Sequence, residues 1–185
     1  EQVEEIVKSY PTPFHIYDEK AIRENARKLK AAFSWNPGYR EYFAVKATPN
    51  PTILKILNEE GCGTDCSSYT ELLMSEKCGI VGDSIMFSSN DTPAEDFILA
   101  RKLGATINLD DYTHVQFLKD TCGIPETISC RYNPGGTFSI STTIMDNPGD
   151  AKYGMTKEQL FKAYVELKEA GAKKFGLHSF LASNT

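Results

Sequence analysis

The sequence of 185 residues has few features of disulfide-rich or metal-centred proteins. It contains five cysteines, an odd number, and no two of them form a CxxC pair. This pattern argues against a disulfide framework and against a zinc site, so we expect no metal. Reduced cysteines are typical of the cytoplasm, which is the location that we expect.

Charge and hydropathy argue against a nucleic-acid-binding protein and against a membrane-spanning one. The net charge is -5 at pH 7 and basic residues form no cluster, so we expect no nucleic-acid partner. No apolar run approaches the roughly 18 residues of a membrane span, and the charged first ten residues do not resemble a signal peptide. The sequence has no initiator Met and stops soon after an apolar strand-like segment. We therefore expect it to be part of a longer protein.

Strand-like and helix-like segments alternate through most of the chain. Candidate strands begin near residues 42, 62, 84, 105 and 127, and candidate helices cover 51–60, 68–78, 93–103 and 111–121. This alternation predicts consecutive βα units and a parallel sheet. A loop is predicted over 132–154, followed by a helix over 156–170 and a sixth strand over 174–178. Before the first unit we predict a helix over 1–10, an edge strand over 14–17 and a helix over 19–33 that Asp18 caps.

Each predicted strand has one apolar face and one small or polar face. The polar faces end in groups that can do chemistry: Lys46, Asp65, Ser88, Asp110, Arg131 and His178. A doubly wound sheet is apolar on both faces, whereas a (β/α) barrel has helices outside and a polar site at the carboxyl ends of its strands. The pattern therefore predicts a barrel. A closed barrel needs eight strands, and we count six.

Lys46 is the last residue but one of the run Tyr42 to Ala47, which reads as a buried strand. Alternation places Tyr42, Ala44 and Lys46 on the same face. A lysine at this position is costly to desolvate unless it is paired or bonded to something. The ordinary alternative is that its side chain reaches solvent.

Seven short motifs occur in order along the chain. They are TPFHIYD (12–18), YFAVKA (42–47), GTDCSSYTEL (63–72), INLD (107–110), RYNPG (131–135), KYGM (152–155) and FGLH (175–178). Together they resemble the fold-type III pyridoxal-phosphate decarboxylases, and among these the diaminopimelate decarboxylases. The resemblance implies a (β/α)8 TIM barrel of the alanine racemase-like type. Residues 1–185 would be the N-terminal part of its cofactor-binding domain, without the last strands and the C-terminal β-domain.

The resemblance also implies roles for individual residues. Lys46 would form the Schiff base with pyridoxal 5'-phosphate, and Asp65 would lie near that imine. Arg131 would lie near the phenolic oxygen of the ring, and His178 and Ser183 around the ring and phosphate. At Phe180 many relatives have a histidine that stacks on the ring; phenylalanine can stack but cannot donate a hydrogen bond.

Four of the polar residues also have ordinary structural explanations. Asp65 and Asp110 could each cap the helix that follows them, and Ser68 could cap its own helix. Glu71 could be a surface carboxylate. These alternatives stay open at the level of sequence.

The implied function is decarboxylation of an amino acid, first of all meso-2,6-diaminopimelate to L-lysine. Ornithine, arginine or carboxynorspermidine are alternative substrates. An alanine racemase-like or cofactor-homeostasis barrel is an alternative of another class, and a non-catalytic role in assembly is a third. The resemblance implies a homodimer for the intact protein, and we expect the isolated 185 residues to be inactive.

Overall fold

A computed structural model describes residues 2–136, 149 and 153–180 of the chain. Its centre is a sheet of six parallel strands in the sequential order β1-β2-β3-β4-β5-β6. The strands are β1 (Tyr42–Ala44), β2 (Gly63–Cys66), β3 (Ile85–Ser89), β4 (Thr106–Leu109), β5 (Thr127–Tyr132) and β6 (Lys174–Ser179). Strand starts agree with the predicted ones to within one residue.

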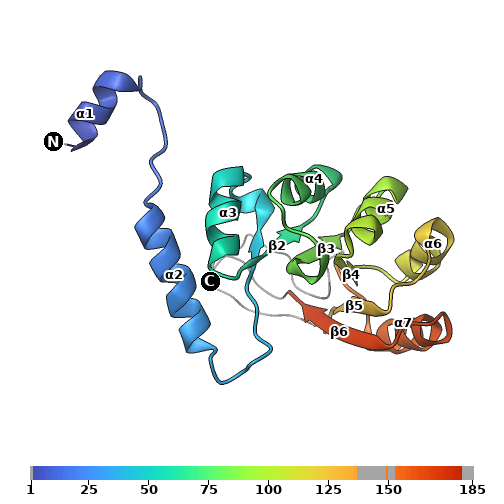
Figure 1. The fold of residues 1–185 in the computed structure, drawn as a ribbon. Helices are drawn as coiled ribbons and strands as arrows, with labels where there is room; N and C mark the ends of the chain where they lie inside the picture. The colour runs from blue at the N-terminus through green and yellow to red at the C-terminus, as the bar shows by residue number, and fades with distance from the viewer. Residues whose placement is uncertain (1, 137–148, 150–152, 181–185) are drawn as a thin grey trace.

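Helices follow the strands and cover one side of the sheet. They are α3 (Pro51–Glu59), α4 (Tyr69–Lys77), α5 (Ala94–Leu103), α6 (Thr113–Cys122) and α7 (Lys157–Glu169). Short 3-10 turns occur at η1 (Val45–Ala47) and η2 (Gly82–Ser84). Figure 1 shows these helices as an outer layer around the curved sheet. Sequential strand order with helices on one side is the arrangement of a (β/α) barrel, which confirms the predicted fold class, with six of the eight barrel strands in the described residues.

The main core lies between the outer face of the sheet and these helices. Strand residues that are fully buried there include Ile85, Phe87, Ile107, Leu109, Ile128 and Cys130. Helix residues such as Leu72, Phe97, Leu118 and Leu167 pack against them. Apolar burial of this kind is the dominant stabilising contribution to the fold.

Side chains at the helix N-termini set where several helices begin. Asn50 accepts from the backbone N–H groups of Thr52 and Ile53, and Ser68 accepts from that of Glu71. Thr156 and Gln159 form a reciprocal capping box at α7. The prediction that Ser68 caps its own helix is therefore confirmed.

The N-terminal segment extends beyond this layered body. α1 (Gln2–Ser9) has no buried residue and projects away from the sheet, whereas α2 (Glu19–Ala32) lies beside α3 (Figure 1). Asp18 caps α2 as predicted, accepting from the N–H of Ala21 at 3.0 Å. The predicted edge strand over 14–17 is wrong, because this segment pairs with no strand in the described part of the chain. Alternating residues form a strand only where a partner satisfies their backbone groups.

Ion pairs and a small apolar cluster attach α2 to α3. Arg23 contacts Glu59 at 2.7 Å and Glu60 at 3.1 Å, and Arg27 also contacts Glu60 at 2.7 Å. Beneath them, Ile22 and Ala26 pack against the buried residues Ile53, Leu57 and Cys62. Within the described residues, no helix has the length and apolar character needed to cross a membrane.

Candidate functional site

Polar side chains gather on the inner face of the sheet, at the carboxyl ends of its strands. Strand register explains the grouping, because Ala44 lies beside Asp65, Ser88 beside Asn108, and Arg131 beside His178. In a parallel sheet these ends lie along one edge, so residues far apart in sequence meet there. The predicted convergence of polar groups is thus observed.

Asp110 and Arg131 form an ion pair between neighbouring strand ends. The Arg131 Nη1 atom donates to Asp110 Oδ1 at 2.7 Å, and the two side chains are 11% and 2% exposed. Asp110 is therefore not the cap of the next helix. That turn is instead organised by Asp111, which accepts from the N–H of Thr113 at 2.8 Å.

Two aromatic rings flank the Arg131 guanidinium. Its carbon lies 4.8 Å from the ring centroid of Tyr153 and 5.2 Å from that of Phe180. Guanidinium groups are attracted to aromatic faces, so these contacts restrict where Arg131 can point. Tyr153 was missed as a site residue in the sequence, although it is the second residue of the KYGM motif. A bridge between Tyr132 and Met155 brings it beside the end of β5.

Asn108 connects β3, β4 and β6. Its Nδ2 atom donates to Ser88 Oγ at 3.0 Å and lies 3.4 Å from His178 Nδ1. The residue is 2% exposed, and its Oδ1 atom is buried without a hydrogen-bond partner in the part of the chain that the structure describes. Asn108 belongs to the INLD motif, but it was missed as a site residue in the sequence. An amide between the apolar residues Ile107 and Leu109 was the available signal.

Lys46 does not lie where strand alternation predicted. β1 ends at Ala44, and the chain turns at once into η1, so Lys46 is on a 3-10 turn and is exposed. The turn forms because the N–H of Thr48 bonds to the carbonyl oxygen of Val45 at 3.2 Å, while Val45 itself is fully buried. The prediction of a strand through residue 47 is therefore wrong, because this local bond replaces sheet pairing.

Asp65, at the adjacent strand end, has a perturbed acidity. Its pKa is raised to about 6, and burial is the largest cause; Lys46 and Arg131 lower the pKa, and Glu71 raises it. Asp65 is not the cap of α4, which is Ser68. Glu71 is more than a surface carboxylate, since it accepts from the backbone N–H of Ser67 at 2.8 Å and holds the loop beside Asp65.

His178 is half-buried between groups of opposite charge. Burial lowers the pKa of its imidazole, and the Arg131 guanidinium lowers it further, while the Asp110 carboxylate raises it. Ser183 lies outside the described residues, as does most of the predicted loop over 132–154. Among the described residues, Asp65, Arg131, His178 and Phe180 lie together at the strand ends, and Lys46 is near enough to Asp65 to lower the pKa of that carboxyl.

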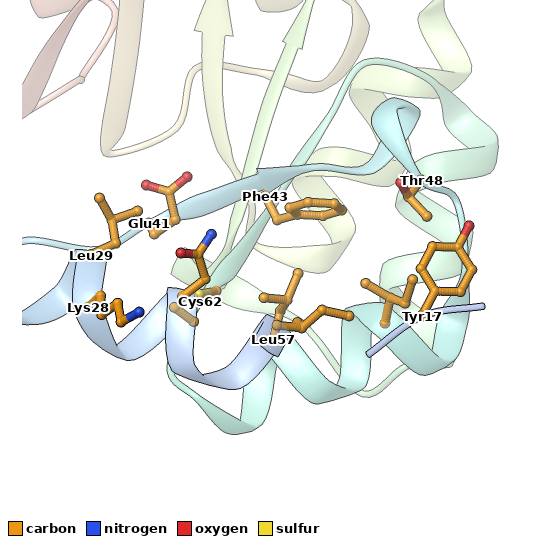
Figure 2. Close-up of a pocket in the computed structure, with 12 residues that line it drawn as sticks. Tyr17, Lys28, Leu29, Glu41, Phe43, Thr48, Leu57 and Cys62 are labelled. Atoms are coloured by element: carbon orange, nitrogen blue, oxygen red, sulfur yellow. The ribbon is translucent and has the colours of Figure 1, made fainter. Parts of the chain in front are cut away.

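A separate cavity of about 640 Å³ lies on the other side of β1. Figure 2 shows it between α2, β1 and α3, with Phe43, Leu57 and Cys62 on its walls. Its lining is mostly apolar, and Lys46 does not contribute to it. We regard it as a packing gap beneath α2 and not as the chemical site.

Comparison with known proteins identifies the class that this fold and site define. Residues 19–185 match the family described as "Pyridoxal-dependent decarboxylase, pyridoxal binding domain". The chain belongs to this family, and the domain that it matches is a pyridoxal-binding one.

Two curated proteins are similar to the chain over nearly its whole length. The chain is 38% identical over 182 residues to protein TabA of Pseudomonas amygdali pv. tabaci, and 32% identical over 185 residues to diaminopimelate decarboxylase of Thermoplasma acidophilum. Each alignment covers 98% of this chain but only 42% and 44% of the relative, respectively. The chain thus spans less than half the length of these relatives.

Solved structures show the same fold. The diaminopimelate decarboxylase of M. jannaschii has a TM-score of 0.86 at 23% identity, covering 98% of this chain and 44% of that one. The diaminopimelate decarboxylase of Helicobacter pylori, solved in complex with L-lysine, has a TM-score of 0.80 at 26% identity. It covers 98% of this chain and 47% of that one.

Proposed function

We propose that the full-length protein is a pyridoxal-phosphate-dependent amino-acid decarboxylase that converts meso-2,6-diaminopimelate to L-lysine. The observation that carries the proposal is the position of Lys46, a primary amine beside the Asp65 carboxyl at the polar end of a pyridoxal-binding barrel domain. Residues 1–185 would be the N-terminal part of that domain, in a cytoplasmic homodimer.

The donor groups at the strand ends fit the proposed cofactor. Lys46 supplies an accessible amine, the group that binds an aldehyde covalently. Asn108 Oδ1 is a buried acceptor without a partner among the described residues, and Phe180 offers an aromatic face. Arg131 and His178 supply further polar groups. We assign Lys46, Asp65, Arg131, His178, Phe180 and Ser183 to this site.

The chain's own residues would hold and polarise the reacting groups. The bound pyridoxal ring supplies the electron sink for the pair of electrons that remains when carbon dioxide leaves. Asp65 is ionised above about pH 6 and would then stabilise positive charge on the Lys46 nitrogen. Asp110 and the two aromatic rings hold Arg131 in one place, so that its charge has a defined direction.

The substrate assignment rests on the relatives. A relative at 32% identity has the name diaminopimelate decarboxylase, and the Helicobacter pylori enzyme of that name was solved with L-lysine bound. L-lysine is the product expected when diaminopimelate loses one carboxyl group. The substrate of this chain would thus be an amino acid with a second polar end.

Covalent labelling of Lys46 tests the cofactor. The full-length protein is mixed with pyridoxal phosphate, reduced with borohydride and mapped by peptide mass. We expect a pyridoxyl group on Lys46, its loss in Lys46→Ala, and no effect of Lys55→Ala, which removes a lysine of α3. Labels scattered over surface lysines, or an unlabelled Lys46, would refute the proposal.

Carbon dioxide release tests the reaction and the substrate. We expect release from meso-diaminopimelate, with lower kcat/KM for ornithine and arginine. The isolated 185-residue chain should release none, because strands and residues that relatives of full length possess are not included in it. Activity confined to another amino acid would keep the reaction class and reject the substrate.

A further inference from the structure

Asn108 reaches His178 from the middle of the sheet and has a partner for each of its amide hydrogens. The amide has two hydrogens on Nδ2 and two neighbouring acceptors, Ser88 Oγ at 3.0 Å and His178 Nδ1 at 3.4 Å. The opposite orientation would place Oδ1 beside Ser88 Oγ and His178 Nδ1, and would move Nδ2 to the buried position where Oδ1 now has no hydrogen-bond partner among the described residues. An unpaired buried acceptor such as Oδ1 is tolerated more readily than unpaired donors.

We infer that Asn108 is a positioning residue that holds His178 as a neutral imidazole with its single proton on Nε2. A ring nitrogen that accepts a hydrogen bond carries no proton, so the proton must be on the other nitrogen. His178 then faces the site as a hydrogen-bond donor and not as a cation. The importance of this state for catalysis rests on the proposed function, but the state itself does not.

The surroundings of His178 favour the same state. Arg131 is its direct neighbour on β5, and this positive charge disfavours a second one on the imidazole. Asp110 is the opposing charge, but it is already bonded to Arg131 at 2.7 Å. Ser88 fixes the other side of the Asn108 amide, so that the amide does not rotate freely.

The proton position can be read directly by NMR. The full-length protein, free of cofactor, is labelled with ¹⁵N-histidine, and the His178 signals are assigned by their loss in His178→Gln. We expect the nitrogen shifts of a neutral ring protonated on Nε2 at pH 7. A ring protonated on Nδ1, or a doubly protonated ring, would overturn the inference.

Variants of the orienting residue sharpen the test. Asn108→Asp places an acceptor where the amide hydrogens were, so the proton should move to Nδ1 and the pKa of His178 should rise by about one pH unit or more. Ser88→Ala should give a mixture of the two ring forms. Thr106→Val, on the same face of β4, should leave the signals unchanged. If Asn108→Asp changed neither the proton position nor the pKa while the protein stayed folded, Asn108 would not control His178.

The outcome is independent of the borohydride experiment. His178 signals report the state of the ring without cofactor, whereas labelling reports the chemistry of Lys46. A protein that labels at Lys46 but has the proton on Nδ1 would keep the proposed function and reject this inference. A protein that has the proton on Nε2 but does not label at Lys46 would keep this inference and reject the proposed function.

Discussion

The two faces of the sheet are stabilised by different kinds of contact. On the outer face, side chains such as Phe87 and Ile107 are fully buried and make only apolar contacts with the helices. On the inner face, Asp110 and Asn108 are just as buried, yet each is fixed by hydrogen bonds to particular partners. The outer face therefore tolerates exchange among apolar residues of similar volume, whereas the inner face depends on which polar group meets which.

The largest expected effect is on the outer face. Phe87→Ala leaves a cavity beside Phe97 and should lower the free energy of unfolding of the full-length protein by about 4 kcal/mol. Urea denaturation measures this loss. Phe161→Ala removes a ring that is 74% exposed and should change stability little. Equal losses in the two variants would contradict the contrast between buried and exposed apolar residues.

A somewhat smaller loss is expected on the inner face. Asp110→Ala leaves the Arg131 guanidinium partly buried without its carboxylate, and should cost about 3 kcal/mol by the same measurement. The double variant Asp110→Ala/Arg131→Met removes the unpaired charge and should recover part of the loss. If the double variant recovered none of the loss, the loss in Asp110→Ala would come from packing and not from an unpaired charge. The inner face would then be stabilised in the same way as the outer face.

The smallest effect is a pH dependence. The folded-state pKa of Asp65 is about 6, above the value of about 3.9 in unfolded chains, so the folded protein binds this proton more tightly. The contribution of Asp65 to stability is therefore full below about pH 4 and is lost as the pH rises through about 6.

Asp65→Asn keeps the shape and removes this titration. Relative to the parent protein, the variant should gain about 1–2 kcal/mol between pH 4 and pH 7, measured by urea denaturation at both values. Asp91→Asn changes an exposed carboxylate and should show no such gain. A constant difference between Asp65→Asn and the parent would mean that burial does not control this acid.

The sequence predicted the repeating part of the fold well. Strand starts and the apolar outer faces follow from alternation and from regular spacing, which are local properties. It failed at residues 14–17, which alternate like a strand but find no partner. It also failed at Lys46, because the strand ends at Ala44 and a backbone bond from Thr48 to Val45 forms a turn in its place.

The sequence by itself determined which residues are polar at the ends of the strands, because residue type and the two-residue alternation of a strand can be read from the sequence alone. Only the tertiary structure decided which of them pair. Asp110 could have capped a helix, but strand register places it beside Arg131. Asn108 could have been a polar residue without a specific partner, but register places it between Ser88 and His178. Pairing across strands depends on register and depth, and these are set by the packing of the whole sheet against its helices.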